Sequence, residues 1–155
     1  MVWKIIMDKL KQFARIAFAS EVSFYLKTHS FHWNVEGSDF YEYHKLFEVI
    51  YTEVYESIDD FAEKIRTLGG FIPVSLHNLN MLTKIDDEDH VPSKDEMIQE
   101  LLMDNEKMVK ILKMTYDAAE AEGEHGFSNF LAERMDAHRK HGWFLRASMK
   151  KDSAV

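Results

Sequence analysis

The sequence predicts an all-α protein, a four-helix bundle with one long crossover. Only 6 Gly and 2 Pro occur among 155 residues, so little of the chain can form turns and a few long elements are expected. Apolar residues recur three and four positions apart in four long segments, as on helices with one buried face. The segment between the second and third helices is too long for a simple turn, and a long crossover is a standard connection in such bundles.

The first two predicted helices form one hairpin. The first runs from about residue 7 to residue 32, and residues 34–37 break it. The second begins near Ser38 or Asp39, where Asp39 and Glu42 have the spacing of a capping box. One face of the second helix carries a stripe at alternating three- and four-residue spacing: Phe40, His44, Phe47, Tyr51, Val54, Ile58, Phe61, Ile65 and Leu68.

The second half of the chain predicts two further helices. Gly69 and Gly70 end the second helix. The linker over residues 71–91 is expected to hold a short helix at about residues 78–84. Ser93 and Glu96 form a second candidate capping box at the start of a helix that runs to about residue 122. The last helix is expected over residues 128–149, and the whole chain, 1–155, is expected to form a single domain.

Composition limits the classes of function. The chain has no Cys, which excludes a disulfide scaffold and a thiolate metal site and fits a reducing, cytoplasmic setting. No apolar run approaches the roughly 20 residues that a membrane span needs. The net charge of −8 disfavours binding to phosphate backbones unless basic residues cluster.

Most of the eight histidines need no functional interpretation. His138 and His141 lie one turn apart, and a solvated or partner-facing surface is the favoured interpretation for this pair. Glu122 and His125 match the Glu-x-x-His string of di-iron bundles, but Gly123 breaks the helix inside the string. The acidic run at 86–89 is interpreted as a solvated loop.

Four polar residues of the second helix form a stronger pattern. His44 and Glu48 are four residues apart, as are Asp59 and Glu63, and all four directions fall within about 100° around the helix. A solvated polar stripe is the usual explanation of such spacing. His44, however, lies on the apolar stripe itself, and His32, just before the turn into this helix, can fold back towards it. A mixture of carboxylate and imidazole ligands suits iron, and zinc is also possible.

The two pairs cannot hold one ion from one chain. Their midpoints are fifteen residues apart, which corresponds to about 22 Å along a helix, whereas bonds from a metal to oxygen or nitrogen are about 2 Å. Either each pair belongs to a separate weak site, or two chains run antiparallel and each contributes half of a shared site.

The chain resembles the Dps family, the mini-ferritins named for DNA protection during starvation. The resemblance rests on residues 32–37, which read HWNVEG, on Phe40 and His44, on residues 58–70, which read IDDFAEKIRTLGG, and on the closing segment 137–146. It covers essentially the whole chain, including the number of helices and the position of the crossover. The fold it implies is a ferritin-like four-helix bundle with a short helix in the crossover.

The resemblance also implies a function. Members form shells of twelve subunits and oxidise Fe(II) with hydrogen peroxide or dioxygen at two-fold interfaces. They store ferric mineral inside the shell, which protects against oxidative damage. Carried over by position, one chain supplies His32, His44 and Glu48, and its partner supplies Asp59 and Glu63. These five residues are the candidate catalytic and metal-binding residues for iron, and Trp33 is expected to lie near the metal.

The chain departs from the family pattern at several positions. Glu48 stands where the family usually has Asp, so the carboxylate moves by one methylene. Asn129 falls where a pore acid is common, which leaves Glu124 and Glu133 as weak candidates for an iron entry path. Lysines near the chain ends are few, at positions 4, 9, 11, 150 and 151, so DNA binding is doubtful. The alternative function is a DNA-compacting architectural protein with little iron chemistry.

Overall fold

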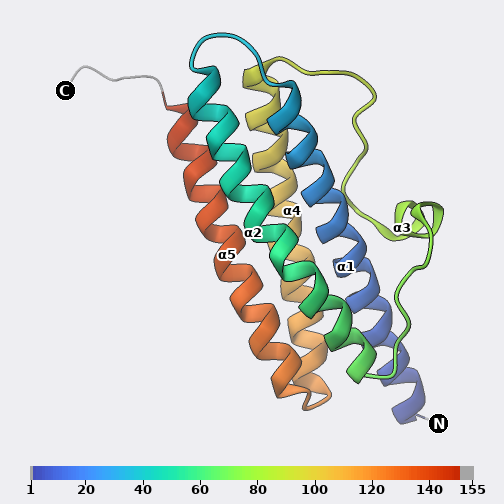
Figure 1. Cartoon of the computed structure of the whole chain (residues 1–155). Helices are drawn as coiled ribbons and strands as arrows, with labels where there is room; N and C mark the ends of the chain where they lie inside the picture. The colour runs from blue at the N-terminus through green and yellow to red at the C-terminus, as the bar shows by residue number, and fades with distance from the viewer. Residues whose placement is uncertain (1, 151–155) are drawn as a thin grey trace.

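The computed structural model describes the backbone of residues 2–150 and the side chains of residues 9–150. Within that range the chain is helical and contains no strand, so the all-α prediction is confirmed. Four long helices lie side by side along most of their length, and a short fifth helix lies outside them (Figure 1). The helices are α1 (Val2–Asn34), α2 (Phe40–Thr67), α3 (Leu76–Leu82), α4 (Lys94–Ala121) and α5 (His125–Met149).

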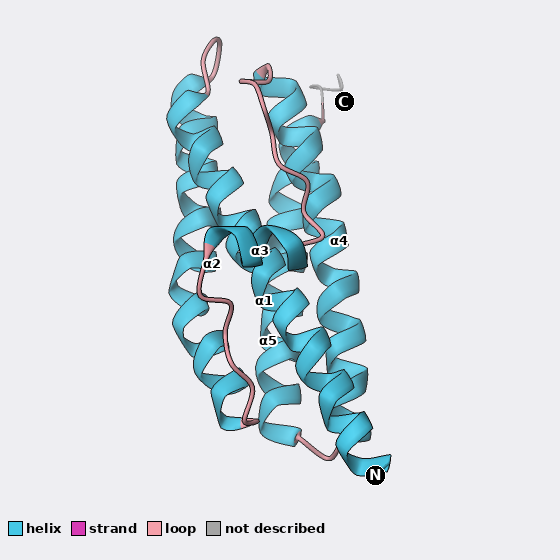
Figure 2. Cartoon of the chain, turned by 90° about the vertical axis from the view of Figure 1, so that its right-hand side faces the viewer, coloured by secondary structure: helices cyan, strands magenta, loops and turns pink. Residues whose placement is uncertain are grey.

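Two antiparallel hairpins make the bundle. Residues 35–39 join α1 to α2, and residues 122–124 join α4 to α5. The crossover, residues 68–93, carries the chain back along the length of the bundle, with α3 about halfway (Figure 2). In the described part of the chain, no helix is both long and apolar enough to cross a membrane.

The core follows the apolar stripe that the sequence predicts for α2. Phe47, Val54 and Phe61 of this stripe are fully buried, and they pack with apolar side chains from the other long helices. Burying a side chain of this size stabilises a protein by about 1.5–3 kcal/mol, so packing of the stripe drives bundle formation. The stripe becomes more exposed towards the start of α2, where Phe40 is 43% exposed and His44 is partly buried.

One of the two predicted capping boxes is confirmed and the other is wrong. The side chain of Ser93 accepts a hydrogen bond from the backbone of Glu96, and the Glu96 carboxylate accepts one from the backbone of Ser93. Asp39 instead adopts a left-handed backbone conformation, with φ 59°, and its side chain makes no capping hydrogen bond. The tight five-residue connection forces this conformation, in which the side chain does not reach the helix start.

Several predicted helix bounds also differ from the structure. The first helix begins earlier, at Val2, because charged residues such as Asp8 and Lys9 continue a helix even where they interrupt an apolar run. The last helix begins at His125, directly after Gly123 reverses the chain with φ 73°. The crossover helix lies two residues earlier than predicted, because Ser75 caps it by accepting a hydrogen bond from the backbone of Asn78.

Candidate metal centre

His32 and His44 face one another at the junction of α1 and α2. Their rings stack with centroids 3.7 Å apart and planes inclined by 19°. Nδ1 of His32 donates to the backbone carbonyl of His44 at 2.7 Å, and Nδ1 of His44 donates to the carbonyl of His32 at 2.7 Å. Because a carbonyl oxygen can only accept, Nδ1 carries the proton in both rings.

This reciprocal pairing fixes the orientation and the tautomer of both rings. With Nδ1 protonated, Nε2 of each neutral ring keeps its lone pair. A metal-bound histidine commonly donates its other ring N–H to a carbonyl, which fixes the tautomer and the ring orientation. The short α1–α2 connection places the last turn of α1 beside the first turns of α2, so the local fold creates the pair.

Glu48 adds a carboxylate on the same side. It lies one turn after His44 and forms an ion pair with Lys45, Nζ to Oε2 2.6 Å. The hydrogen bond from Lys45, together with its positive charge, lowers the pKa of Glu48. The carboxylate is therefore ionised at neutral pH, one helical turn from His44.

Asp59 and Glu63 lie apart from this group. Both are exposed on the second half of α2. No three His, Asp or Glu side chains converge closely enough to hold a metal ion within the part of the chain that the structure describes. One chain thus brings together His32 and His44, with Glu48 one turn further along α2, and it presents Asp59 and Glu63 elsewhere on the same helix.

An aromatic cluster covers the histidine pair on the α1 side. The ring of His29 stacks on Tyr51 with centroids 3.8 Å apart and planes 13° apart, and Trp33 lies 4.0 Å from His29. Trp33 therefore borders the site through His29 rather than directly, and it is 61% exposed. Sequence reasoning missed His29, although its position one turn before His32 was a readable signal.

Large apolar side chains are exposed on α2 and on the crossover. On α2 they interleave with the candidate ligands. A surface with this many exposed apolar side chains is typical of a site of association. The residues are Phe40, Tyr41, Val49 and Tyr55 on α2, and Phe71, Val74, Leu76, Met81 and Val91 on the crossover.

His138 and His141 are buried, so the prediction that they lie on a solvated or partner-facing surface is wrong. Nε2 of His138 meets the carboxylate of Glu21 at 2.9 Å, and Nε2 of His141 meets Glu53 at 3.2 Å. The sequence could not show this arrangement because Glu21 lies on α1, far from α5 along the chain. The internal polar cluster consists of Glu21, Glu53, Asn105, Arg134, His138 and His141.

The ionisation of this internal polar cluster is strongly perturbed. Burial alone would raise the pKa of Glu21, but the charges and hydrogen bonds of His138 and Arg134 outweigh it and lower the pKa to about 2. Burial, reinforced by the neighbouring positive charges of His138 and Arg134, lowers the pKa of His141 to about 3. At neutral pH, Glu21 is therefore ionised and the His141 ring is neutral.

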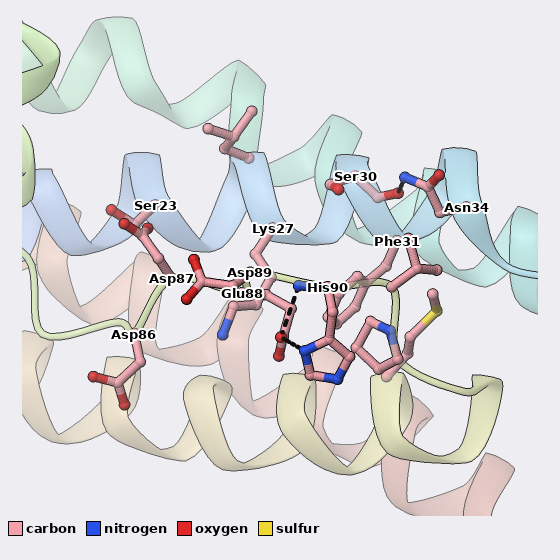
Figure 3. Close-up of a pocket in the computed structure, with 14 residues that line it drawn as sticks. Ser23, Lys27, Ser30, Phe31, Asn34, Asp86, Asp87, Glu88, Asp89 and His90 are labelled. Carbon is pink, nitrogen blue, oxygen red and sulfur yellow. Dashed lines mark hydrogen bonds and ion pairs between the residues drawn. The ribbon is translucent and has the colours of Figure 1, made fainter.

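A separate hollow of about 320 Å³ lies between α1 and the crossover (Figure 3). Asp87 and Asp89 are exposed there, as expected for a solvated loop. Glu88 instead pairs with His90 at 2.6 Å, and Lys27 on the helix side forms an ion pair with Asp104 at 2.7 Å. The hollow contains none of the predicted iron ligands.

Comparison with known proteins agrees with the fold and with the sequence motifs. Residues 16–155 match the family described as "Ferritin-like domain". An uncharacterised low temperature-induced protein of Nostoc is 34% identical over 79% of this chain and 69% of the relative. A DNA protection during starvation protein of Helicobacter pylori is 33% identical over 84% of this chain and 92% of the relative. A Vibrio cholerae Dps crystal structure, titled as a member of a broad superfamily of ferritin-like diiron-carboxylate proteins, is 26% identical with a TM-score of 0.88, covering 94% of this chain and 92% of that one.

Proposed function

Because this chain belongs to the Dps family of ferritin-like proteins, we propose that it binds Fe(II) at a site shared by two copies, oxidises it, and stores the ferric product inside a shell. The observation that carries the proposal is the His32–His44 pair, whose two Nδ1 atoms are engaged by backbone carbonyls. That arrangement leaves two Nε2 lone pairs, with the ionised Glu48 one turn after His44, and imidazole with carboxylate is a donor set suited to iron.

Each ligand has a role that follows from its chemistry. His32 and His44 bind Fe(II) as neutral donors and keep their orientation through the carbonyl hydrogen bonds. Glu48 gives up its ion pair with Lys45 and supplies negative charge, which favours Fe(III) over Fe(II). Iron is the substrate, and the oxidant, hydrogen peroxide or dioxygen, accepts its electrons.

The remaining ligands come from a second copy. Asp59 and Glu63 are exposed on α2, about 22 Å along the helix from His44 and Glu48. A two-fold axis that crosses α2 between the two pairs runs the helices antiparallel and brings Asp59 and Glu63 of one chain to His44 of the other. The exposed apolar side chains of α2 and the crossover are then buried in the interface, and each dimer has two sites.

We infer that such dimers assemble further into a closed shell of about twelve copies, as the family resemblance implies. A closed shell explains how an oxidised, insoluble product is retained. Sedimentation at micromolar concentration should show a single compact assembly. A protein that remained monomeric or dimeric would contradict the storage part of the proposal.

Iron oxidation tests the site. Fe(II) added without oxygen and then exposed to hydrogen peroxide should produce ferric absorbance, and His44→Ala should abolish the fast phase because it removes one Nε2 donor. His90→Ala is the matched control, since His90 is exposed on the crossover, away from the site. Equal loss in both variants, or no loss in either, would refute the assignment.

A further inference from the structure

The internal polar cluster draws side chains from all four long helices. Glu21 comes from α1, Glu53 from α2, and Arg134 and His138 from α5, with Asn105 of α4 beside them. Glu21 and His138 are fully buried, and Arg134 is only 4% exposed. Charges this deep in a bundle destabilise the fold unless they are paired, so their arrangement needs a physical account.

Arg134 occupies the centre of the cluster. Its Nη2 atom lies 2.6 Å from Oε1 of Glu21 and 3.2 Å from Oε2 of Glu53, so two carboxylates meet one nitrogen. Nη1 bonds Glu53 and Nε bonds Glu21 as well. The guanidinium thus occupies the position at which a single cation would bridge both carboxylates.

His138 completes the set of donors around that position. Asn105 donates through Nδ2 to the backbone carbonyl of His138, so its Oδ1 faces the ring and accepts from Nδ1 at 2.8 Å. The other ring nitrogen, Nε2, faces the Glu21 carboxylate. Since both partners of the ring are acceptors, the ring carries a proton on each nitrogen. Two carboxylates are therefore balanced by a guanidinium and an imidazolium.

The donor types match those of a metal site. Glutamates and histidines that project inward from several helices are the ligands of di-iron sites in ferritin-like bundles. In this chain no three such donors converge in the described residues, and the guanidinium stands between Glu21 and Glu53. His141 adds a buried imidazole next to Glu53, and its Nδ1 has no hydrogen-bond partner in the part of the chain whose side chains are described.

We propose that the guanidinium of Arg134 occupies the position of a metal ion inside the bundle. Without Arg134, Glu21, Glu53 and His138 bind one divalent transition-metal ion. The guanidinium keeps iron out of the bundle interior. Iron chemistry is thereby restricted to sites outside the core. The inference concerns residues distinct from the proposed interface ligands and does not depend on oxidation at that interface.

The charge balance of the cluster supports the replacement of the guanidinium by a divalent ion. When a divalent ion replaces the guanidinium and His138 releases its Nε2 proton to solvent, the cluster again has two positive and two negative charges. Bonds from such an ion to carboxylate oxygen and imidazole nitrogen are about 2.0–2.2 Å. The carboxylates must therefore move by roughly 0.5–1 Å from their present distances to Nη2, which side-chain rotation allows.

A route to the cluster exists at the surface. A hollow of about 280 Å³ between α2 and α5 has Arg134 in its wall and is lined by Glu56, Asp60 and Glu133 as well as Glu53. Acidic walls concentrate cations near the entrance. Because Arg134 lines the hollow, its side chain lies where it can block the access of an ion to the internal polar cluster.

Metal content tests the proposal directly. Arg134→Ala is made in a chain that also carries His44→Ala and Asp59→Ala, so that the interface ligands do not contribute. After incubation with Co(II) and gel filtration, the variant should retain about one more ion per chain than its parent and show the visible absorption of protein-bound Co(II). Arg134→Lys in the same background is the matched control and should retain none, because lysine keeps a cation in place.

Adding Glu21→Gln to the Arg134→Ala variant should remove the extra ion, since one bridging carboxylate is lost. A folded Arg134→Ala variant without the extra ion would overturn the proposal, and so would an ion that survives Glu21→Gln. If Arg134→Ala does not fold alone, it is refolded with Co(II) and with chelator. Helical circular dichroism recovered only with Co(II) would support the proposal, and failure in both conditions would overturn it.

Discussion

Replacing His141 should make the protein less sensitive to mild acid. His141 is only 3% exposed, and its environment lowers its pKa from 6.5 to about 3. In the unfolded chain the same ring has its ordinary pKa of about 6.5. Below that pH the unfolded state binds a proton that the folded state does not, so acid favours unfolding.

The size of the effect follows from the difference in protonation. Each pH unit below 6.5 lowers the free energy of unfolding by about 1.36 kcal/mol until the folded-state pKa is approached. Between about pH 7.5 and pH 5 the loss due to His141 is therefore about 2 kcal/mol. Glu21 contributes little in this range, because its lowered pKa makes its stabilisation decline only as the pH falls from 4.5 towards 2.

The assay is urea denaturation of the wild type and His141→Gln at both pH values. Glutamine cannot titrate, and its amide can still donate to Glu53. The two proteins are compared at equal concentration, since association also contributes to apparent stability. On acidification, the wild type should lose about 2 kcal/mol more than the variant. Equal losses would show that His141 is protonated in the folded state and would refute the account of its burial.

The remaining predictions concern the helix caps and DNA. Ser93→Ala should lower the free energy of unfolding by about 1 kcal/mol because it removes the hydroxyl that accepts from the backbone of Glu96, and thermal melts would detect this. Asp39→Gly should leave stability unchanged or raise it by up to about 1 kcal/mol, since glycine adopts φ 59° without strain; a clear loss would mean that Asp39 caps α2 after all. Gel shifts at about 0.15 M salt should show weak DNA binding, given the charge of −8 on each chain, and tight binding at that salt would contradict this expectation.

The fold could be predicted from the sequence because helical periodicity is a local property. The stripe through Phe47, Val54 and Phe61 marks the buried face of α2 without knowledge of its neighbours. Ser93 and Glu96 mark the start of α4 through bonds within one turn. Local patterns failed at Asp39, where the backbone conformation depends on how closely α1 and α2 are joined.

The candidate site could be predicted in part. The spacing of His44, Glu48, Asp59 and Glu63 indicated two pairs of ligands that lie too far apart to bind one ion from the same chain. The position of His32, just before the turn into α2, already suggested that it can fold back towards His44, and the family resemblance assigned it as a ligand. The stacking of His32 on His44 and the reciprocal carbonyl bonds depend on the packing of two helices, which periodicity does not describe.

The main error of the sequence interpretation was to place His138 and His141 on a surface, whereas both are buried. Two histidines one turn apart on an otherwise charged segment are usually solvated. Their partners are Glu21 of α1 and Glu53 of α2, and only the folded bundle brings these to α5. Buried polar groups are paired, but a sequence does not show which partners are brought close.

The shared site is the central claim, and mixing two inactive variants tests it most directly. His44→Ala and Asp59→Ala should each be nearly inactive alone, because every site lacks one ligand. When the two are co-expressed, random pairing makes about half of the two-fold pairs mixed, and each mixed pair has one complete site. About a quarter of wild-type iron oxidation should therefore return. If all ligands came from one chain, no chain in the mixture would be complete, and verified mixed shells without recovered activity would contradict the account.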